Sequence, residues 1–179
     1  MRYVGLLFIV AAGIGAGIHY GRRLHRRARF LQRTTRLMRT MEQHMSYAAR
    51  PLATMWRGFA ADEMFGDFSL VTETVALLGS MPFAAAVQTA VRGLATSEGL
   101  TAADCGLICE FASGCGVTGI DEQREHLRTY ARLCAQQSEE AAEEATARTP
   151  VCRVMGLAAG VGTALLFLEG GVHTRWMWI

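Results

Sequence analysis

The chain has 179 residues, 51% of them hydrophobic, and its 18 basic side chains against 16 acidic ones give a formal net charge of +2. This length suits one domain of modest size, and the charge balance excludes a chain that is basic throughout. Because there is no lysine, no phosphate loop ending in Gly-Lys-Ser/Thr can exist, and neither H-E-x-x-H nor G-x-S-x-G occurs, so we predict a protein that is not an enzyme and uses no cofactor or metal.

The first predicted element is an apolar helix, Val4–Ile18, with a tyrosine just beyond each end. Counting these tyrosines it reaches about 18 residues, just enough to span a bilayer. A cleaved signal peptide is the alternative, but the positive charges follow the apolar run, which favours an uncleaved span with its N-terminus outside the cytoplasm. Gly13, Gly17 and Gly21 recur at four-residue steps and either form a smooth packing face or pack against nothing in particular.

The stretch that follows, Arg22–Leu52, is the most basic part of the chain. Eight arginines and no acidic residue fall between Arg22 and Arg39, which predicts a cytoplasmic helix that faces anionic lipid headgroups and not nucleic acid. The predicted membrane-surface patch consists of Arg22, Arg23, Arg26, Arg27, Arg29 and Arg33. The same helix, running to about Ala49, carries an apolar stripe at three- and four-residue steps that must pack against the rest of the chain. Its members are Phe30, Thr34, Leu37, Met41 and Ala48.

Shorter helices are predicted after a turn at Arg50–Pro51, because the residue before a proline avoids the helical region. Thr101 and Asp104 have the spacing of a capping box, with Asp in place of Glu. No stretch alternates with a period of two, so every element is predicted to be helical. The predicted ranges are Leu52–Ala61, Gly66–Ser80, Phe83–Ser97 and a helix after Thr101 that stops at Gly114 or Gly116.

The last soluble helix is predicted to begin near Asp121. One face is made of small residues, which favours close helix packing, either within the bundle or between subunits. This seam consists of Leu127, Ala131, Cys134, Ser138, Ala141 and Ala145. The acidic cluster of Glu139, Glu140, Glu143 and Glu144 is interpreted as a solvated face, with docking of a basic partner as the alternative.

Pro150 is predicted to break the chain before a second apolar run, Met155–Leu168, in which Gly156 and Gly160 again have small-x-x-x-small spacing. We predict that this run is a second span, with both termini outside the cytoplasm. The expected fold is all-α, a cytoplasmic antiparallel helical bundle between an N-terminal and a C-terminal transmembrane helix. The predicted segments are 1–21 (first span), 22–152 (bundle), 153–170 (second span) and 171–179 (non-cytoplasmic tail).

Five cysteines form no C-x-x-C pair, and free thiols are the default interpretation. A redox or metal sensor is an alternative, although the spacing matches no standard zinc module. Its ligands would be Cys105, Cys109 and Cys115 with His126.

Three ordered groups of residues carry a resemblance to a known family over nearly the whole chain. The first is Leu37, Met41, Glu42, Tyr47, Pro51 and Leu52 after the first apolar run. The second is Leu100, Asp104, Leu107, Phe111 and Gly114, followed by Asp121, Glu122 and Gln123. The third runs from Arg153 through Gly156 to Gly160. In this order the chain resembles the stage III sporulation protein AB family.

The resemblance implies a membrane protein of endospore-forming bacteria, made in the mother cell and placed in the outer forespore membrane. It implies a soluble domain similar to the helical domains of the type II secretion platform protein. The implied role is a platform of the mother-cell-to-forespore channel. The implied partners are a secretion-type ATPase and other membrane proteins of the same operon. The arginine-rich helix adds anionic lipid to the expected partners, and association into a homo-oligomer is left open. The alternative function is a membrane-anchored adaptor or sensor whose arginine-rich helix reads anionic lipid.

Overall fold

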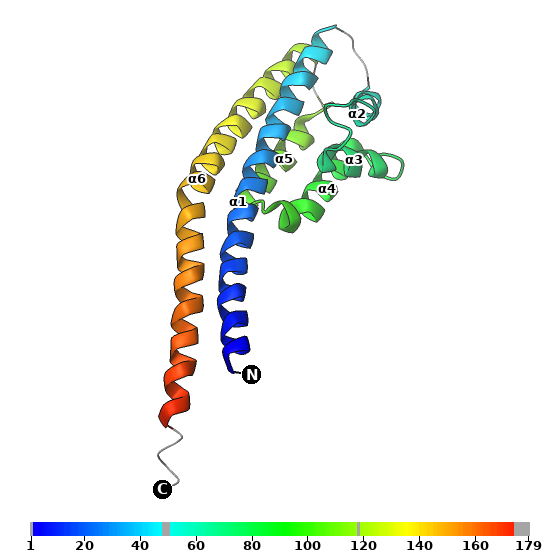
Figure 1. Cartoon of the computed structure of the whole chain (residues 1–179). Helices are drawn as coiled ribbons and strands as arrows, with labels where there is room; N and C mark the ends of the chain where they lie inside the picture. Colours follow the sequence, from blue (N-terminus) through cyan, green and yellow to red (C-terminus); the bar gives the residue numbers. More distant parts are fainter. Residues whose placement is uncertain (1, 48–50, 118, 174–179) are drawn as a thin grey trace. The chain divides into compact units, whose positions relative to one another are not determined.

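The computed structural model describes residues 2–47, 51–117 and 119–173, and these form six helices and no strand (Figure 1). The predicted all-α fold class is therefore confirmed. The side chains of residues 2–7, 9, 46–47, 120, 153 and 164–173 lie outside the description. The helices are α1 (Arg2–Tyr47), α2 (Leu52–Ala60), α3 (Ser69–Leu77), α4 (Phe83–Glu98), α5 (Ala102–Gly114) and α6 (Ile120–His173).

The chain divides into two compact units. The bundle unit is Arg26–Ala141, and the helix-pair unit is made of the described residues of Met1–His25 and Ala142–Ile179. The two long helices, α1 and α6, contribute residues to both units. The bundle unit lies inside the predicted range 22–152.

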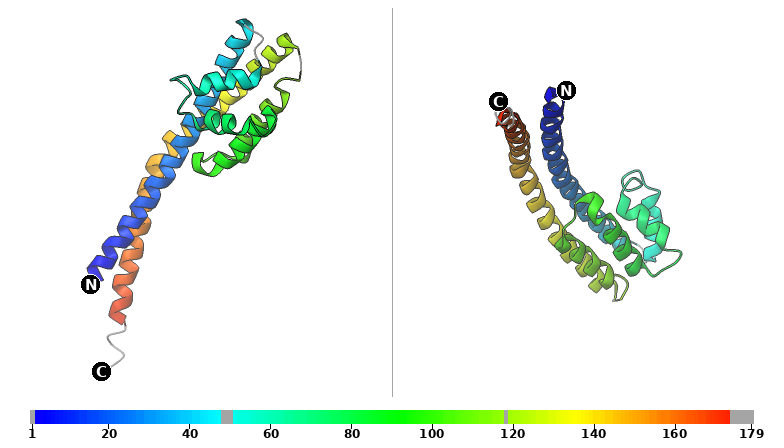
Figure 2. Two further views of the ribbon diagram at one scale, coloured as in Figure 1. Left: turned by 90° about the vertical axis from the view of Figure 1, so that its right-hand side faces the viewer. Right: turned by 90° about the horizontal axis from the view of Figure 1, so that it is seen from below.

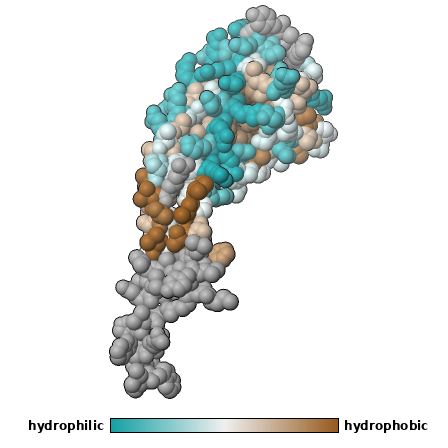
Figure 3. All heavy atoms as spheres, viewed as in Figure 1, coloured by the Kyte–Doolittle hydropathy of each residue, from teal (hydrophilic) through white to brown (hydrophobic). Residues whose placement is uncertain are grey.

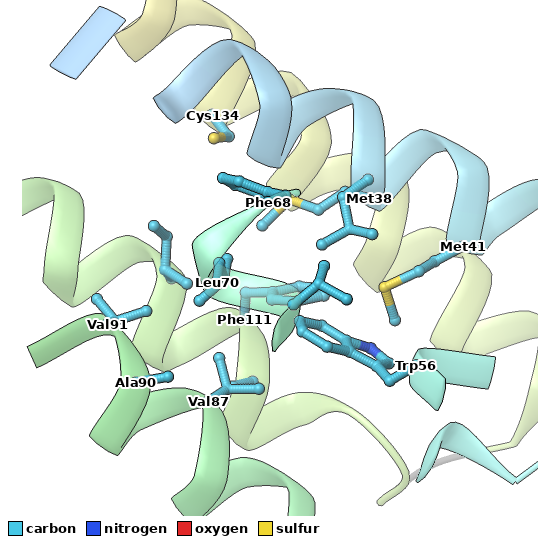
Figure 4. Close-up of a cluster of buried hydrophobic side chains, with 14 of the residues drawn as sticks. Met38, Met41, Trp56, Phe68, Leu70, Val87, Ala90, Val91, Phe111 and Cys134 are labelled. Carbon is cyan, nitrogen blue, oxygen red and sulfur yellow. The ribbon is translucent and has the colours of Figure 1, made fainter. Parts of the chain in front are cut away.

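The bundle unit has one continuous apolar core, to which α1 and α6 contribute one wall and the shorter helices the other. The stripe predicted on α1 is confirmed, since Phe30, Thr34, Leu37 and Met41 are all buried, while Ala48 lies outside the described residues. Figure 4 shows Trp56 of α2 and Phe111 of α5 meeting the methionines of α1 inside this core. In Figure 2, α2–α4 lie to one side of the α1 and α6 segments of this unit.

Local signals set several helix ends, and the cap predicted at Thr101 is confirmed. Thr101 caps α5, accepting a hydrogen bond from the backbone N–H of Asp104, while the Asp104 carboxylate accepts one from the N–H of Thr101. Gly99 ends α4 with a φ of 74°, a conformation that glycine adopts without strain. The small-residue seam of α6 is buried apart from the half-buried Ser138, and Cys134 donates to the carbonyl of Leu31 on α1 over 3.5 Å. The part of the seam in the bundle unit therefore packs within the bundle.

The break predicted at Pro150 is wrong, because α6 continues through it as one helix. A proline inside a helix removes one N–H donor and favours a kink, but neighbouring turns hold the helix together when side chains and packing support them. Here the hydroxyls of Thr146 and Thr149 bond back to the carbonyls of Ala142 and Ala145. Proline alone was thus an insufficient stop signal.

The helix-pair unit consists of two antiparallel segments, the N-terminal part of α1 and the C-terminal part of α6. Gly21 lies against Thr149 and Gly13 lies against Gly156, so residues nearer the N-terminus of α1 contact residues nearer the C-terminus of α6. In the part of the chain that the structure describes, no helix is both long enough and apolar enough to cross a bilayer. Both predicted spans, Val4–Ile18 and Met155–Leu168, include side chains outside the description, so they stay a prediction.

Candidate functional site

Among the described residues of the bundle unit, the best-buried ion pair joins a predicted patch residue to a family-motif residue. Arg27 Nε donates to Asp104 Oδ2 over 2.7 Å and a second guanidinium nitrogen donates to Oδ1 over 3.1 Å. The Asp104 side chain is fully buried, whereas that of Arg27 is 13% exposed. Burial of the Asp104 carboxyl raises its pKa, but the hydrogen bonds from Arg27 and Thr101 outweigh burial, so the net pKa lies below its ordinary value. Arg27 therefore anchors the start of α5 to α1.

Arg33 is held in a second ion pair, at the surface of the bundle unit. Its guanidinium donates to both carboxylate oxygens of Asp67 and to the carbonyl of Met64, and it lies 4.8 Å from the centre of the Phe68 ring. The hydrogen bond from Arg33 is the main reason that the pKa of Asp67 is lowered. Arg33 thus ties the loop before α3 to α1.

The other predicted patch residues are distributed over both units. Arg22 and Arg23 are exposed in the helix-pair unit. Arg26 is half-buried in the bundle unit, and its Nε has no partner among the described residues, while Arg29 is exposed. Arg26, Arg29 and Arg33 line a hollow of about 280 Å³ next to the first residue of α3, Ser69. Of the predicted patch arginines, Arg27 and Arg33 are thus held by ion pairs to described residues inside the bundle unit.

A groove of about 420 Å³ runs between α1 and α6 in the bundle unit. At one end Arg128 Nε donates to the motif residue Glu42 over 2.6 Å. The other lining residues are Arg39 of α1 and Ala131, Arg132, Ala135, Gln136 and Glu139 of α6.

Gly114 leaves room for an aromatic cluster at the end of α5. His126 Nε2 lies 2.9 Å from the carbonyl oxygen of Phe111, and its ring stacks on Phe111 at 14° and approaches Tyr130 to 4.5 Å. A Cβ at position 114 would lie 2.2 Å from the His126 ring. Sequence reasoning named His126 only as a candidate metal ligand and missed this packing role, because nothing local to His126 indicates that the end of α5 lies beside it.

Of the remaining motif positions, Pro51 accepts backbone hydrogen bonds, and the other described side chains are half-buried or exposed. The Pro51 carbonyl accepts the N–H groups of Thr54 and Met55 at the start of α2, and Leu52 is half-buried. The side chain of Tyr47 lies outside the described residues. Asp121 is exposed, and Gln123 is half-buried with an Nε2 atom that has no partner among the described residues.

The four predicted packing glycines meet in the helix-pair unit. A Cβ at Gly13 would lie 2.5 Å from the carbonyl oxygen of Gly156 and 3.1 Å from the Cα of Gly160. A Cβ at Gly156 would lie 2.5 Å from the Gly13 oxygen and 3.3 Å from the Cα of Gly17. Two backbones approach this closely only where neither has a side chain, so these four residues form a close-packed glycine seam.

Large apolar side chains cover the outside of the same helix pair, where Figure 3 shows brown spheres gathered. Phe8 is 70% exposed, and Val154 and Met155 are each 66% exposed. A contiguous exposed apolar surface marks contact with a membrane or another protein. This apolar surface is made of Phe8, Ile14, Tyr20, Val151, Val154, Met155, Leu157 and Val161.

All five cysteines are free thiols, and the part of the chain that the structure describes contains no group of three or more residues able to hold a metal ion. Burial raises the pKa of Cys115 to about 12 and that of Cys134 to about 11. Burial is also the main cause of the raised pKa of Cys105. These three side chains are therefore protonated thiols at neutral pH.

Taken together, the fold defines an all-helical protein with an antiparallel helix pair and a separate compact bundle. No curated protein and no solved structure matches the chain. The family model of stage III sporulation protein AB matches residues 2–168, nearly the whole chain, and the chain belongs to that family. The resemblance carried by the ordered motifs is thereby confirmed, and the protein is sporulation-related.

Proposed function

We propose that this chain is a non-enzymatic platform subunit of the mother-cell-to-forespore channel. The helix pair is embedded in the outer forespore membrane, and the bundle unit stands in the mother-cell cytoplasm. There it assembles with a secretion-type ATPase and other membrane proteins of the same operon. Membership of a sporulation family supports the setting.

The observation that carries this proposal is the combination of a glycine seam and an apolar surface in one unit. The seam holds two helices together by backbone contact, which is a common way to pack helices in lipid, where burial of apolar area gives no driving force between them. The apolar surface then faces outward, as acyl chains require. Arg22 and Arg23 are exposed in the same unit, where anionic headgroups attract each positive charge by about 1 kcal/mol.

Replacement of one seam glycine tests the proposal. Gly13→Leu places a side chain against the Gly156 carbonyl and separates the helices, whereas Gly15→Leu on the same helix has nothing within 4 Å of its Cβ and serves as the matched control. We expect Gly13→Leu to lose co-purification of the ATPase and the other membrane subunits from sporulating cells, and Gly15→Leu to retain it. Equal recovery of partners with both variants would argue against assembly through the helix pair.

A membrane-anchored adaptor that reads anionic lipid is the second candidate, favoured by the exposure of Arg22 and Arg23. The double variant Arg22→Gln/Arg23→Gln separates the two functions, because neither arginine belongs to the bundle unit. The adaptor function predicts loss of sporulation without loss of any protein partner. The platform function predicts that partners and sporulation are lost or kept together.

A further inference from the structure

A hollow beside α1 of the bundle unit carries more positive than negative charge. Three arginines line it, Arg26, Arg29 and Arg33, against the two carboxylates of Asp67 and Glu98, which leaves one positive charge in excess. The Arg26 Nε atom is buried and has no hydrogen-bond partner among the described residues. Because a buried donor without an acceptor costs free energy, this hollow of about 280 Å³ suits a single carboxylate from outside.

The long helices of the bundle unit give a common scale of position along α1 and α6. Cys134 donates to the carbonyl of Leu31, so these two residues mark a point where the helices lie side by side. Glu42, later in α1, pairs with Arg128, earlier in α6, so the helices run antiparallel here. A distance along one helix can therefore be compared with a distance along the other.

On this scale Glu139 of α6 lies at the same level as Arg26 of α1. Arg26 comes five residues before Leu31, which is about 7.5 Å along α1. Glu139 comes five residues after Cys134, which is the same distance in the same direction because the helices are antiparallel. Glu139 is exposed, and no hydrogen bond or ion pair joins it to another described residue.

These two charged residues point to opposite sides of the bundle unit. Thr35 interacts with the Cys134 thiol and so marks the side of α1 that faces α6. Arg26 comes nine residues before Thr35, or two and a half turns, and therefore points away from α6. Glu139 lies about 140° around α6 from Cys134 and points away from α1. Each copy thus presents a cation on one side and an anion on the other, at one level.

We propose that copies of this chain associate side by side, with the Glu139 carboxylate of one copy inserted into the hollow of the next and paired with Arg26. The contact rests on the membrane placement proposed above. Copies whose helix pairs lie in one membrane have their long helices pointing the same way, which brings residues of the same level together. Because two different faces meet, the contact repeats from copy to copy and forms assemblies larger than a dimer.

Charge reversal in the full chain in mild detergent, with association measured by sedimentation, tests this contact. Arg26→Glu and Glu139→Arg each place like charges in every contact, so each is expected to raise the dissociation constant about tenfold. The double variant Arg26→Glu/Glu139→Arg restores every pair with opposite sign and is expected to associate like the unaltered chain. Arg57→Glu, at an exposed position of α2, is the matched control and should associate normally.

Several results would overturn the proposed contact. Single variants that associate normally place any contact elsewhere, and a double variant that does not recover contradicts the pairing of these two residues. A species no larger than a dimer contradicts the repeating arrangement. Circular dichroism shows whether each variant keeps its helices, and Glu139→Arg, at an exposed position, carries the test even if Arg26→Glu unfolds.

The same experiment separates this contact from the platform function. An unaltered chain that sediments as a monomer at every concentration excludes a second copy as the occupant of the hollow. If that monomeric chain still co-purifies with the ATPase, the inference fails while the platform function stands.

Discussion

At the scale of single residues, Asp104 takes part in both a buried ion pair and the capping box of α5. Its buried carboxylate accepts hydrogen bonds from the Arg27 guanidinium and from the Thr101 N–H, while its own N–H donates to the hydroxyl oxygen of Thr101, the N-cap of α5. Removing one member of a buried ion pair leaves an uncompensated charge, which costs more than the pair itself contributes. Asp104 therefore determines whether α5 stays attached to α1.

We predict that Asp104→Ala destabilises the protein by about 3 kcal/mol, because it leaves the Arg27 charge without its carboxylate and removes one half of the capping box. Thr101→Ala keeps the ion pair and should cost only about 1 kcal/mol. Asp121→Ala is the matched control, since that side chain is 99% exposed and its change should stay within about 0.5 kcal/mol. Thermal or urea unfolding of the full chain measures all three. A loss for Asp104→Ala no larger than that of the control would contradict the anchoring role.

The lowered pKa of Asp104 predicts a particular pH dependence. Because the folded-state pKa lies below the unfolded value, the contribution of this carboxylate is present above about pH 3.9, the usual aspartate pKa, and is lost as the pH falls through the folded value. The difference in unfolding free energy between the unaltered chain and Asp104→Asn should thus be constant near neutral pH and shrink below about pH 4. A difference that grows on acidification would mean that the folded pKa is raised instead.

At the scale of elements, the end of α5 depends on Gly114. The sequence indicated that this position matters but did not show why a glycine is needed there. Family-motif spacing pointed to Gly114, but only the fold shows that the His126 ring occupies the space above it. The ring cannot swing aside freely, because it is stacked on Phe111 and hydrogen-bonded to the Phe111 carbonyl.

Two alanine substitutions on α5 should therefore have opposite effects. Gly114→Ala is expected to destabilise by about 1 to 3 kcal/mol through overpacking against His126. Gly106→Ala has nothing within 4 Å of the new Cβ and should stabilise by about 0.5 to 1 kcal/mol, because alanine is the better helix former. The unfolding free energies of both variants test this prediction. Stabilisation by both substitutions would contradict it, because the His126 ring would then move aside without any loss of stability.

Residue spacing within single helices predicted the elements well, but it did not predict which residues form ion pairs across the fold. The buried stripe of α1, the capping box at Thr101 and the seam of α6 each follow from residue spacing within one helix. The ion pair of Arg27 with Asp104 joins residues 77 positions apart, and that of Glu42 with Arg128 spans 86 positions. Nothing in the spacing of one helix selects such partners. For the same reason the arginines were interpreted as one lipid-facing patch, although Arg27 and Arg33 form ion pairs within the bundle unit.

The break expected at Pro150 failed for a different reason. Helix propensity is a local preference of a few kcal/mol at most, and the packing of α6 on either side of the proline outweighs it. The segment before the proline is anchored through Ala141 and Ala145, each almost fully buried, and the segment after it through Gly156, which lies against Gly13 of α1. The amino-acid composition around Pro150 does not show how tightly the neighbouring turns of α6 are packed.

At the scale of the whole molecule, the chain combines a core-forming bundle unit with a helix pair whose outer surface is apolar. The bundle unit gathers aromatic side chains of α1, α2 and α5, and of the loop before α3, in one apolar core. The helix pair buries glycines and exposes Phe8, Val154 and Met155 instead. This inversion of the usual pattern supports the proposal that the helix pair lies in a membrane while the bundle unit meets other proteins.

The most direct test of the platform function is purification of the tagged chain in mild detergent from sporulating and from vegetative cells, with bound proteins identified by mass spectrometry. We predict recovery of a secretion-type ATPase and of other small membrane proteins from the membrane fraction of sporulating cells only. A chain that is equally abundant in growing cells and brings down no stable partner would contradict the platform function and favour the lipid adaptor.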